Sequence, residues 1–403
     1  MSRLRHLLAL AGRHRELTIL IVLTTLLMSG STIVTPVLPI YAGTFAASST
    51  MIGLVITLYG VGRLISNLPA GLLSYRFGNK PLLLVACGLM IVASAGAALT
   101  GDLTWLLVWR FVQGVSSGIY MTVSAASIAY LADDRMRARI MSLHQSAIFL
   151  GAGIGPALGG LVAGLFGITA PFWACAVIGA VALATTCLSR IPKPSADLPG
   201  EPETRLGATL AGALIRPLYL ALCLVTFVAY FTRTASQFQL VPLIAYEDYD
   251  LGLDTIGLAL SILALTTFVA LPLAGALIDR VGARSVVVGS SLLTALSLVM
   301  IAEGHTLVWF WTGMVTLGVA VGFNSPAVMA LVTSITPRHL YGPAIGFMRT
   351  CGDVGYILGP ILVGLVDDWT TWGKPGGLLL NALLAVVGSV LFLPLYRLFR
   401  KRG

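Results

Sequence analysis

Charged side chains are scarce in this sequence, making up 10% of its 403 residues, whereas hydrophobic residues make up 57%. A soluble domain carries about 25% charged residues, so this composition excludes a chain built from soluble domains. The apolar runs also lack the alternation of polar and apolar residues that a transmembrane β-barrel needs. Because a backbone in hydrocarbon must satisfy its own hydrogen bonds, the composition predicts an all-α integral membrane protein.

Several motifs that would indicate other functions are missing as well. The sequence has no HExxH, GxSxG or P-loop pattern and no pair of carboxylates suited to catalysis, so we do not expect an enzyme. It has no long polar segment that would form the soluble domain of a receptor. The five cysteines have no CxxC spacing, and we predict neither a disulfide nor a metal site.

Long apolar runs are what the sequence has instead. Each is about 20 residues long or longer, as a helix that crosses a bilayer requires. The basic segment 1–16 has no A-x-A cleavage site, which favours a cytoplasmic segment on the membrane surface over a removed signal peptide. We predict twelve transmembrane helices, with approximate bounds 17–41, 50–74, 81–100, 104–132, 139–166, 170–190, 217–245, 255–278, 284–302, 306–333, 340–366 and 375–397.

The net charge of +9 is distributed unevenly across the membrane. An even number of spans places both termini on one side, which we take as the cytoplasm. Most of the 25 Lys and Arg residues then fall on that side, and Lys374 alone lies in an outer loop, where acids such as Glu247 and Asp248 are found. This is the positive-inside pattern, so the basic charge does not predict a nucleic-acid partner. We expect a monomeric, multi-pass protein of a bacterial inner membrane.

The chain repeats itself at a separation of 204 residues. The stretch GLLSYRFGNK at 71–80 returns as GALIDRVGAR at 275–284, and Gly155-Pro156 returns as Gly359-Pro360. A single register held over several helix pairs predicts two six-helix bundles, related as parallel repeats about an axis along the membrane normal. The expected segments are a first bundle at 17–190, a proline-rich cytoplasmic linker at 191–216, a second bundle at 217–397 and a cytoplasmic tail at 398–403.

These features together resemble the major facilitator superfamily of secondary transporters, over nearly the whole chain. The stretches at 71–80 and 275–284 resemble the loop motif between helices 2 and 3 of that family and its echo between helices 8 and 9. RFVQGVSSG, from Arg110 to Gly118, resembles the helix 4 motif, and GAGIGPALGG at 151–160 resembles the helix 5 motif of drug/proton antiporters. The resemblance implies transport driven by a proton gradient, without a cofactor, and small molecules, protons and membrane lipids as partners.

The resemblance also implies that the loop motifs form a cytoplasmic gate. The motif's acid is expected to face the positive N-terminal end of a helix from the opposite half. In the second copy, Asp279 is the acid, and the helix it would face begins near Arg139. The first copy has Tyr75 at this position: either it has lost the ionic contact that closes the gate, or Tyr75 is an aromatic residue at the membrane interface. Small residues in the Gly-Pro motifs are expected to let helices of the two halves cross closely. The predicted gating residues are Gly71, Tyr75, Arg76, Gly78, Lys80, Gly275, Asp279, Arg280, Gly282, Arg284, Gly151, Gly155, Pro156, Gly159, Gly160, Gly359 and Pro360.

Ionisable residues within the spans predict a polar interior, because a charge at mid-membrane costs roughly 2.5 to 3.5 kcal/mol. Arg349 and Asp353 lie four residues apart on one helix face. They form either a permanent ion pair or a proton-coupling site, in which Asp353 takes up a proton when the arginine is drawn away. Two further coupling candidates are Arg110, through its motif, and His144. Purely structural roles for both residues stay open.

The expected substrate cavity combines polar and aromatic side chains, which bind by hydrogen bonding and by burial. Arg233 either lines this cavity or extends outwards to the membrane surface. The first helix has no acid, and the four buried arginines outnumber the one acid, so a purely cationic substrate is not favoured. We predict proton-coupled efflux of amphipathic small molecules, with transport of organic anions or lysolipid-like amphiphiles as the alternative. The predicted cavity residues are Arg63, Asn67, Gln113, Arg233, Gln237, Tyr59, Phe231 and Phe347.

Overall fold

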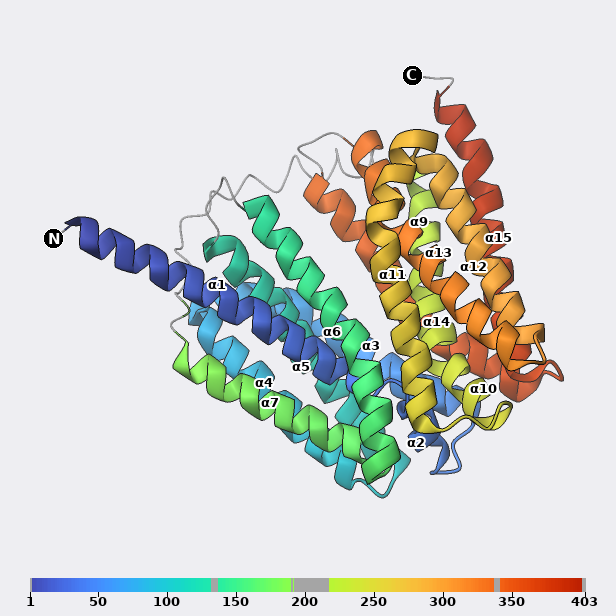
Figure 1. Ribbon diagram of the computed structural model, residues 1–403, viewed down its shortest axis with the longest axis horizontal. Coiled ribbons are helices and arrows are strands. Elements are labelled where there is room, and N and C mark those ends of the chain that lie inside the picture. Colours follow the sequence, from blue (N-terminus) through green and yellow to red (C-terminus); the bar gives the residue numbers. More distant parts are fainter. Residues whose placement is uncertain (1, 132–136, 190, 192–216, 337–340, 401–403) are drawn as a thin grey trace. The chain divides into compact units, whose positions relative to one another are not determined.

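A computed structural model of the chain describes residues 2–131, 137–189, 191, 217–336 and 341–400. All regular secondary structure in these residues is helical (Figure 1). Apart from Ile191, the predicted linker at 191–216 lies outside the described residues. The fold class is therefore all-α, as the composition predicts.

The first half of the sequence forms one short and six long helices. They are α1 (Ser2–Ile33), α2 (Leu38–Gly43), α3 (Ser49–Phe77), α4 (Asn79–Leu99), α5 (Leu103–Leu131), α6 (Arg137–Phe166) and α7 (Ala170–Leu188). The second half forms α9 (Pro217–Phe231), the π-helix η1 (Thr232–Leu240), α10 (Val241–Glu247), α11 (Leu253–Val281), α12 (Ala283–Glu303), α13 (Leu307–Ile335), α14 (Tyr341–Trp369) and α15 (Gly373–Arg400).

These helices account for the expected membrane spans. Within the described residues, 11 helical segments are long and apolar enough to cross a bilayer; α1 with α2 counts as one, and so does the run from α9 to α10. The remaining long helix, α5, has 29 residues and carries the polar side chains of Arg110 and Gln113. Together they agree with the twelve predicted spans.

The helices group into two compact units. Unit 1 consists of Met1–Phe45, Leu58–Leu198 and Gly252–Leu258, and unit 2 consists of Ala46–Thr57, Pro199–Leu251 and Ala259–Gly403. The helices α3 and α11 each contribute their first turns to one unit and their remainder to the other. These two helices therefore belong to both units through the continuity of the chain.

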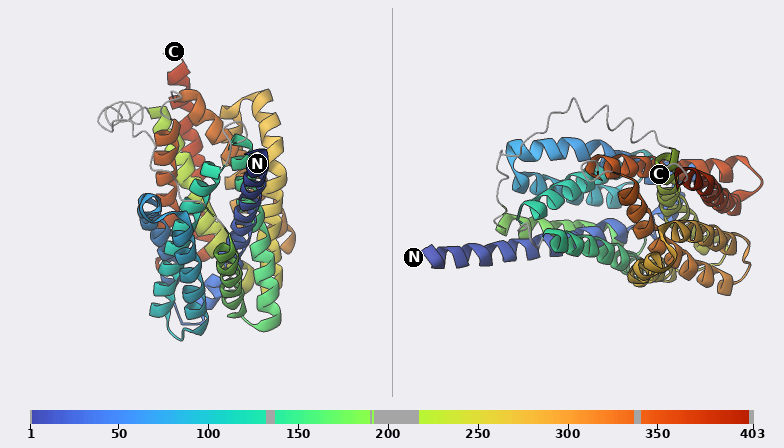
Figure 2. Two further views of the ribbon diagram at one scale, coloured as in Figure 1. Left: turned by 90° about the vertical axis from the view of Figure 1, so that its left-hand side faces the viewer. Right: turned by 90° about the horizontal axis from the view of Figure 1, so that it is seen from above.

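Within unit 1, α1 packs against α6, and α4 packs against both α5 and α7 (Figures 1 and 2). Glycines allow α6 to approach α1 closely: a Cβ atom added at Gly155 would lie 2.7 Å from the Ser29 carbonyl oxygen, and one at Gly159 only 1.7 Å from that of Ile33. In unit 2, α14 approaches α9 in the same way, because a Cβ atom at Gly355 would lie 2.2 Å from a carbonyl oxygen of α9. Small residues thus set the helix spacing inside each unit.

This packing differs only in part from what we expected of the Gly-Pro motifs, which we predicted to lie where helices of the two sequence halves cross. Gly151, Gly155 and Gly159 share one face of α6 and meet α1 of their own half. Gly160 lies about 100° further around the helix, and it meets the backbone of α11 at Leu253 instead. The motif therefore allows close packing against two helices, α1 on one face of α6 and α11 on another.

Two predicted helices contain interruptions. The expected helix 17–41 divides into α1 and α2, because Pro36 and Pro39 lack the N–H groups that would continue the helical ladder. The expected helix 217–245 widens into η1, whose last turn is closed by Val241 N–H donating to the Ser236 carbonyl oxygen, five residues back. Pro242 follows directly and has no N–H group to donate to this turn.

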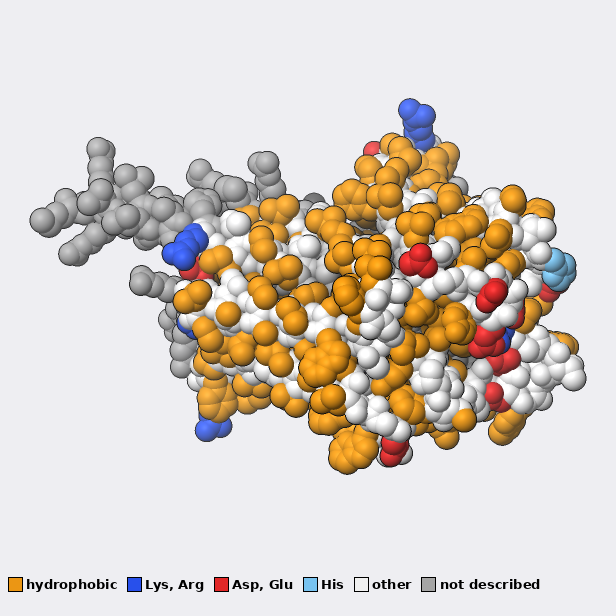
Figure 3. All heavy atoms as spheres, turned by 60° about the horizontal axis from the view of Figure 1, so that its bottom comes forward, with side chains coloured by type: hydrophobic (Ala, Val, Ile, Leu, Met, Phe, Trp, Pro, Cys, Tyr) orange, Lys and Arg blue, Asp and Glu red, His pale blue; other side chains and the backbone are white. Residues whose placement is uncertain are grey.

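The outside of the bundles is apolar. Large hydrophobic side chains such as Leu72, Val92 and Leu265 are more than half exposed, and the face in Figure 3 is mostly hydrophobic with few charged side chains. An exposed apolar surface of this extent marks contact with lipid rather than with water.

Charged groups gather where the chain leaves the spans of unit 2. Lys374 and Glu247 form an ion pair that joins the start of α15 to the end of α10. Burial raises the pKa of the neighbouring Asp248 carboxyl, and the Lys374 charge opposes this rise.

Candidate functional site

The helix α5 brings a buried charge into unit 1. Arg110 and Gln113 lie about one turn apart, and their side chains are 5% and 6% exposed. Arg110 Nη1 donates to Gln113 Oε1 at 2.6 Å, a distance typical of a hydrogen bond strengthened by charge. The guanidinium is therefore held in place by its own helix.

The hydrogen bonds continue from Gln113 to two other helices. Gln113 Nε2 donates to Ser94 Oγ of α4 at 2.9 Å, and Ser94 Oγ donates to Cys175 Sγ of α7 at 3.1 Å. Every bond in this chain donates away from the guanidinium. The chain of dipoles thus spreads the positive charge of Arg110 over three helices.

An aromatic ring covers the other side of the guanidinium. The Tyr59 hydroxyl donates to Ser117 Oγ at 2.8 Å, which keeps the ring of α3 against α5. Glycines make this contact possible: a Cβ atom at Gly114 would lie 2.1 Å from the Tyr59 carbonyl oxygen, and one at Gly62 would lie 2.3 Å from that of Phe111. The two helices meet closely enough for a cation–π contact between Arg110 and Tyr59.

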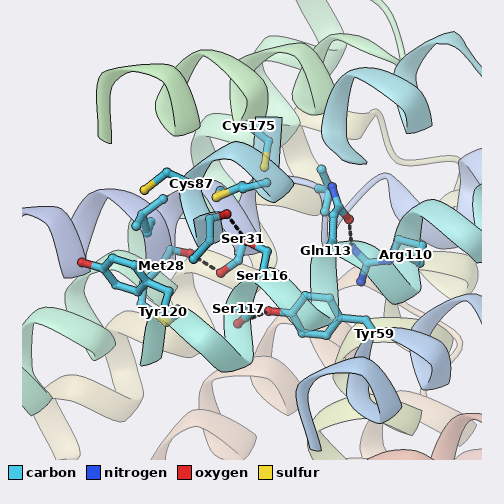
Figure 4. Close-up of a pocket in the computed structure, with 14 residues that line it drawn as sticks. Met28, Ser31, Tyr59, Cys87, Arg110, Gln113, Ser116, Ser117, Tyr120 and Cys175 are labelled. Atoms are coloured by element: carbon cyan, nitrogen blue, oxygen red, sulfur yellow. Dashed lines mark hydrogen bonds between the residues drawn. The ribbon is translucent and has the colours of Figure 1, made fainter. Parts of the chain in front are cut away.

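Arg110, Gln113 and Tyr59 line a small cavity in unit 1 (Figure 4). Its volume of about 30 Å³ has room for roughly two water molecules. The described residues of its wall include hydroxyls, thiols and thioethers from α1, α4, α5 and α7, but no Asp or Glu. The arrangement can therefore hold water beside a fixed positive charge. The other lining residues are Leu27, Met28, Ser31, Val34, Ala86, Cys87, Met90, Ser116, Ser117, Tyr120 and Cys175.

Two further predicted cavity residues lie on α3 beyond Tyr59. Arg63 is half-buried, and Asn67 is half-buried one turn later. When its amide is oriented so that the nitrogen faces these acceptors, Asn67 donates to the carbonyl oxygens of Arg63 at 3.2 Å and of Gly118 at 3.3 Å. Neither residue belongs to the wall of the small cavity, so their role in substrate binding stays a prediction.

His144 lies on α6 with its side chain 3% exposed. Its Nε2 atom is buried and has no hydrogen-bond partner among the described residues. On α1, the helix packed against α6, Glu16 is also buried, and its Oε2 atom likewise has no hydrogen-bond partner among the described residues. We did not predict a role for Glu16, because it falls at the end of the basic segment 1–16; only its burial distinguishes it from a surface acid.

The remaining predicted site residues lie in unit 2. On α14, Arg349 is exposed and Asp353 is half-buried. On η1, Arg233 is exposed with its guanidinium 5.6 Å from the Phe238 ring centre, and Gln237 is buried. Phe231 is fully buried inside the unit, and Phe347 is exposed. These residues do not form one described pocket, and their roles in coupling and binding stay predictions.

The two loop motifs share a backbone feature. Gly78 has φ 91° and Gly282 has φ 82°, a region that residues with a Cβ atom avoid, which explains the glycine in both copies. In the first copy, Lys80 Nζ donates to the carbonyl oxygens of Cys187 at 2.8 Å and Ser189 at 2.7 Å. Lys80 therefore caps the C-terminal end of α7.

Three charged residues of these motifs are exposed, whereas Lys80 and Arg284 are half-buried. Asp279 and Arg280 are exposed at the end of α11, and Arg76 is exposed at the end of α3. The side chain of Tyr75 lies outside the described residues. The latch that we predict for Asp279 therefore stays a prediction.

Comparisons with known proteins agree with this architecture. A family model described as Major Facilitator Superfamily matches residues 20–252 and 222–402. An uncharacterized MFS-type transporter of Methanocaldococcus jannaschii, MJ1560, is 22% identical over 349 residues, which cover 85% of this chain and 88% of that protein. The multidrug resistance protein MdtL of Escherichia coli K12 is 24% identical over 362 residues, which cover 88% of this chain and 89% of MdtL.

A solved structure has the same fold. The bacterial homologue of the human lysosomal transporter Spinster superposes with a TM-score of 0.77 at 15% sequence identity, over 96% of this chain and 98% of that chain. The family match, the apolar helical spans and this likeness agree over nearly the whole sequence. The chain therefore belongs to the Major Facilitator Superfamily and is a multi-pass transporter of the inner membrane.

Proposed function

We propose that this transporter is a proton-driven exporter of amphipathic small molecules. In this proposal it acts as a monomer by alternating access, with two six-helix bundles at 17–190 and 217–397 that move against each other. The observation that carries the proposal is the buried guanidinium of Arg110, held by Gln113 and Tyr59 beside a cavity with room for water. A multidrug resistance protein among the relatives supports the substrate class.

Proton coupling would use this charge together with a carboxylate. A fixed positive charge on a cavity wall lowers the affinity of nearby groups for protons, so a proton is released when its carrier approaches Arg110. Asp353 is the proposed carrier, since it is a half-buried carboxylate within a span. Arg349, one turn earlier on the same helix, would stabilise its charged form. His144, buried on α6, is a second proposed proton site.

The small cavity is proposed to serve protons rather than the substrate. Pockets for drug-sized molecules have volumes of about 300–1,000 Å³, far above the 30 Å³ beside Arg110. The substrate would therefore bind in a larger space that opens during the cycle. The side chains proposed to reach it are those of Tyr59, Arg63, Asn67 and, from unit 2, Arg233 and Gln237.

Transport of organic anions is a second candidate function. Its support is that Arg110 and Arg63 both lie within one unit and that no acid lines the described cavity. An anionic headgroup would then be attracted to this region, whereas a cationic drug would be repelled.

The test is transport in proteoliposomes with an imposed pH gradient. Cationic, neutral and anionic amphiphiles are compared for accumulation against their own gradients. We expect Asp353→Asn to abolish accumulation while exchange of labelled substrate persists. Asp102→Asn, which removes an acid from an exposed loop, is the matched control and should behave like the parent.

Two outcomes would overturn these assignments. If Asp353→Asn still concentrates substrate as well as the parent does, the coupling role of Asp353 is wrong. If only anionic amphiphiles are carried, with or without a pH gradient, the second candidate function replaces the first.

A further inference from the structure

The sequence repeat continues into two helix crossings. In unit 1, the start of α11 crosses α6: a Cβ atom at Gly257 would lie 2.4 Å from the Pro156 carbonyl oxygen, and one at Gly160 would lie 2.4 Å from that of Leu253. Backbone meets backbone at both points. No side chain larger than hydrogen fits at either glycine without displacing the partner helix.

In unit 2, the start of α3 crosses α14 in the same way. A Cβ atom at Gly53 would lie 2.3 Å from the Pro360 carbonyl oxygen, and one at Gly364 would lie 2.6 Å from that of Ser49. Each of these four residues is 204 positions from its counterpart in the first crossing. The chain therefore builds one crossing twice, with glycines at matching positions.

The two crossings differ in charge. In the α3–α14 crossing, Asp368 accepts hydrogen bonds at 2.9 Å from the backbone N–H groups of Ser49 and Thr50, one on each carboxylate oxygen. Asp367 accepts a further bond from the Ser49 hydroxyl. The counterparts of the two acids, 204 positions earlier, are Ala163 and Gly164. α6 therefore brings no carboxylate to its crossing at these two positions; the acid found there, Asp254, belongs to the first turn of α11 itself and lies next to Gly164.

These bonds follow from the physics of a helix end. The first N–H groups of a helix have no partner within it and carry a partial positive charge. Asp368 supplies both the missing acceptors and the opposite charge to α3, although it belongs to α14. A carboxylate that caps its own helix stabilises one helix, whereas this one joins two.

Other contacts extend the crossing along α3. Gln239 Nε2 donates to the Ser49 carbonyl oxygen at 2.9 Å, and Thr57 Oγ1 donates to the Ile357 carbonyl oxygen at 2.7 Å. Thr57 is 3% exposed. The residues of α3 from Ser49 to Thr57 are thus attached to unit 2, while α3 from Leu58 onwards belongs to unit 1.

A transporter that works by alternating access must change the contacts of helices that belong to both units. We propose that Asp368, supported by Asp367, is a positioning residue for transport: its carboxylate holds the first turn of α3 against α14, and this contact breaks and re-forms in each cycle. In the α6–α11 crossing, α6 has Ala163 and Gly164 at these positions and supplies no carboxylate to the first turn of α11, so no contact of this kind breaks when it opens. The proposal needs neither a particular substrate nor proton coupling.

The test measures how often the crossing opens. A Thr57→Cys reporter is placed in a variant without the five native cysteines and reacted, in membranes, with a membrane-impermeant maleimide added from outside. Asp368→Asn removes the charge and presents an amide NH₂ to a backbone N–H group. We expect it to raise the labelling rate roughly tenfold, the effect of losing hydrogen bonds to a charged acceptor. An unchanged rate would overturn the proposal.

A matched control distinguishes the contact that Asp368 makes between α14 and α3 from ordinary capping within one helix. Asp102 caps α5 by accepting a hydrogen bond from Thr104 N–H at 2.5 Å, within one segment of chain. We expect Asp102→Asn to leave the labelling of Thr57→Cys unchanged. An equal increase from both variants would show a general loss of helix stability, and the proposal would then be wrong.

A second pair of variants tests the crossing without changing charge. Gly53→Ala should raise labelling because its Cβ atom meets the Pro360 carbonyl oxygen. Gly346→Ala, on α14 with nothing within 4 Å of the added atom, should not raise it. Equal labelling of these two variants would show that the crossing does not open. All labelling is done without substrate or a pH gradient, so a failed proton-coupling assignment would not affect these results.

Discussion

The guanidinium carbon of Arg110 lies 4.7 Å from the centre of the Tyr59 ring. The two residues come from different helices, α5 and α3, and the ring is fixed from its far end by the hydrogen bond of its hydroxyl to Ser117. A cation–π contact shielded from water contributes about 2 kcal/mol. The pair therefore positions the charge of Arg110 at the cavity wall.

Tyr59 provides the first prediction. Tyr59→Leu removes the π face, and we expect it to lower the initial rate of transport about tenfold or more, as a loss of about 2 kcal/mol implies. Tyr59→Phe keeps the ring and loses only the hydroxyl, and it should retain most of the rate. Initial rates in proteoliposomes, normalised to protein, check this. If Tyr59→Phe and Tyr59→Leu lower the transport rate equally, the hydroxyl of Tyr59 and not its ring is required.

A second prediction concerns the partner of Arg110 on its own helix. Gln113→Glu is nearly isosteric and places a carboxylate where Arg110 Nη1 now donates to an amide oxygen. The new ion pair neutralises the guanidinium, so the protein should fold normally and lose transport driven by a pH gradient by at least about tenfold.

Gln113→Leu has a different expected result. It leaves the guanidinium and Ser94 without their amide partner and should lower the stability of the purified protein by about 1–3 kcal/mol. Thermal unfolding in detergent separates the two variants. Transport by Gln113→Glu at the parental rate would contradict a role for the positive charge of Arg110.

The sequence predicts the spans well because a backbone segment of this apolar composition can satisfy its hydrogen bonds in hydrocarbon only as a helix. The division of the first span is also visible in the sequence, at Pro36 and Pro39. The π-helix from Thr232 to Leu240 is not, since its composition suits a regular helix equally, and its wider turns depend on the packing around it. The local sequence pattern therefore predicts the position of a helix better than it predicts whether its turns are α-helical or π-helical.

Some residues of the candidate site can also be predicted from the sequence, and others cannot. Arg110 and Gln113 stand out because polar residues within a span are costly. Tyr59 lies on the wall of the small cavity, and its predicted place in a substrate cavity stays a prediction. Ser94 and Cys175 complete the hydrogen-bonded chain, but they look like ordinary small residues of apolar helices. Their part in the site depends on how α4 and α7 are rotated about their axes, which a single sequence does not encode.

A third prediction tests the close approach of α3 and α5. Gly114→Ala places a methyl group 2.1 Å from the Tyr59 carbonyl oxygen, so the helices must separate. We expect a loss of about 1–3 kcal/mol in stability. Gly88→Ala, on α4 with nothing within 4 Å of the new atom, is the control and should be neutral or stabilising. Equal thermal unfolding of the two variants would contradict the packing.

A fourth prediction concerns the basic residue of the first loop motif. Lys80→Met keeps the length of the side chain and removes the charge that binds two carbonyl oxygens at the end of α7. The expected loss is about 1–2 kcal/mol, combining the helix dipole with the hydrogen bonds. Arg76→Met, at an exposed position of the same motif, should change stability by less than about 0.5 kcal/mol. A larger loss from Arg76→Met would contradict the capping role of Lys80.

The last prediction compares the two copies of the loop motif at their one difference in charge. Asp279→Asn removes the acid, and if Asp279 latches a helix N-terminus the loss is about 1–2 kcal/mol, or roughly tenfold in the rate of transport. Tyr75→Phe removes no charge and should stay within about twofold of the parent. Initial rates in inverted membrane vesicles, normalised to the amount of protein, compare the two. Equal losses would mean that the motif acts through features that both copies share, such as Arg76 and Arg280 or the positive-φ glycines Gly78 and Gly282, and not through the acid.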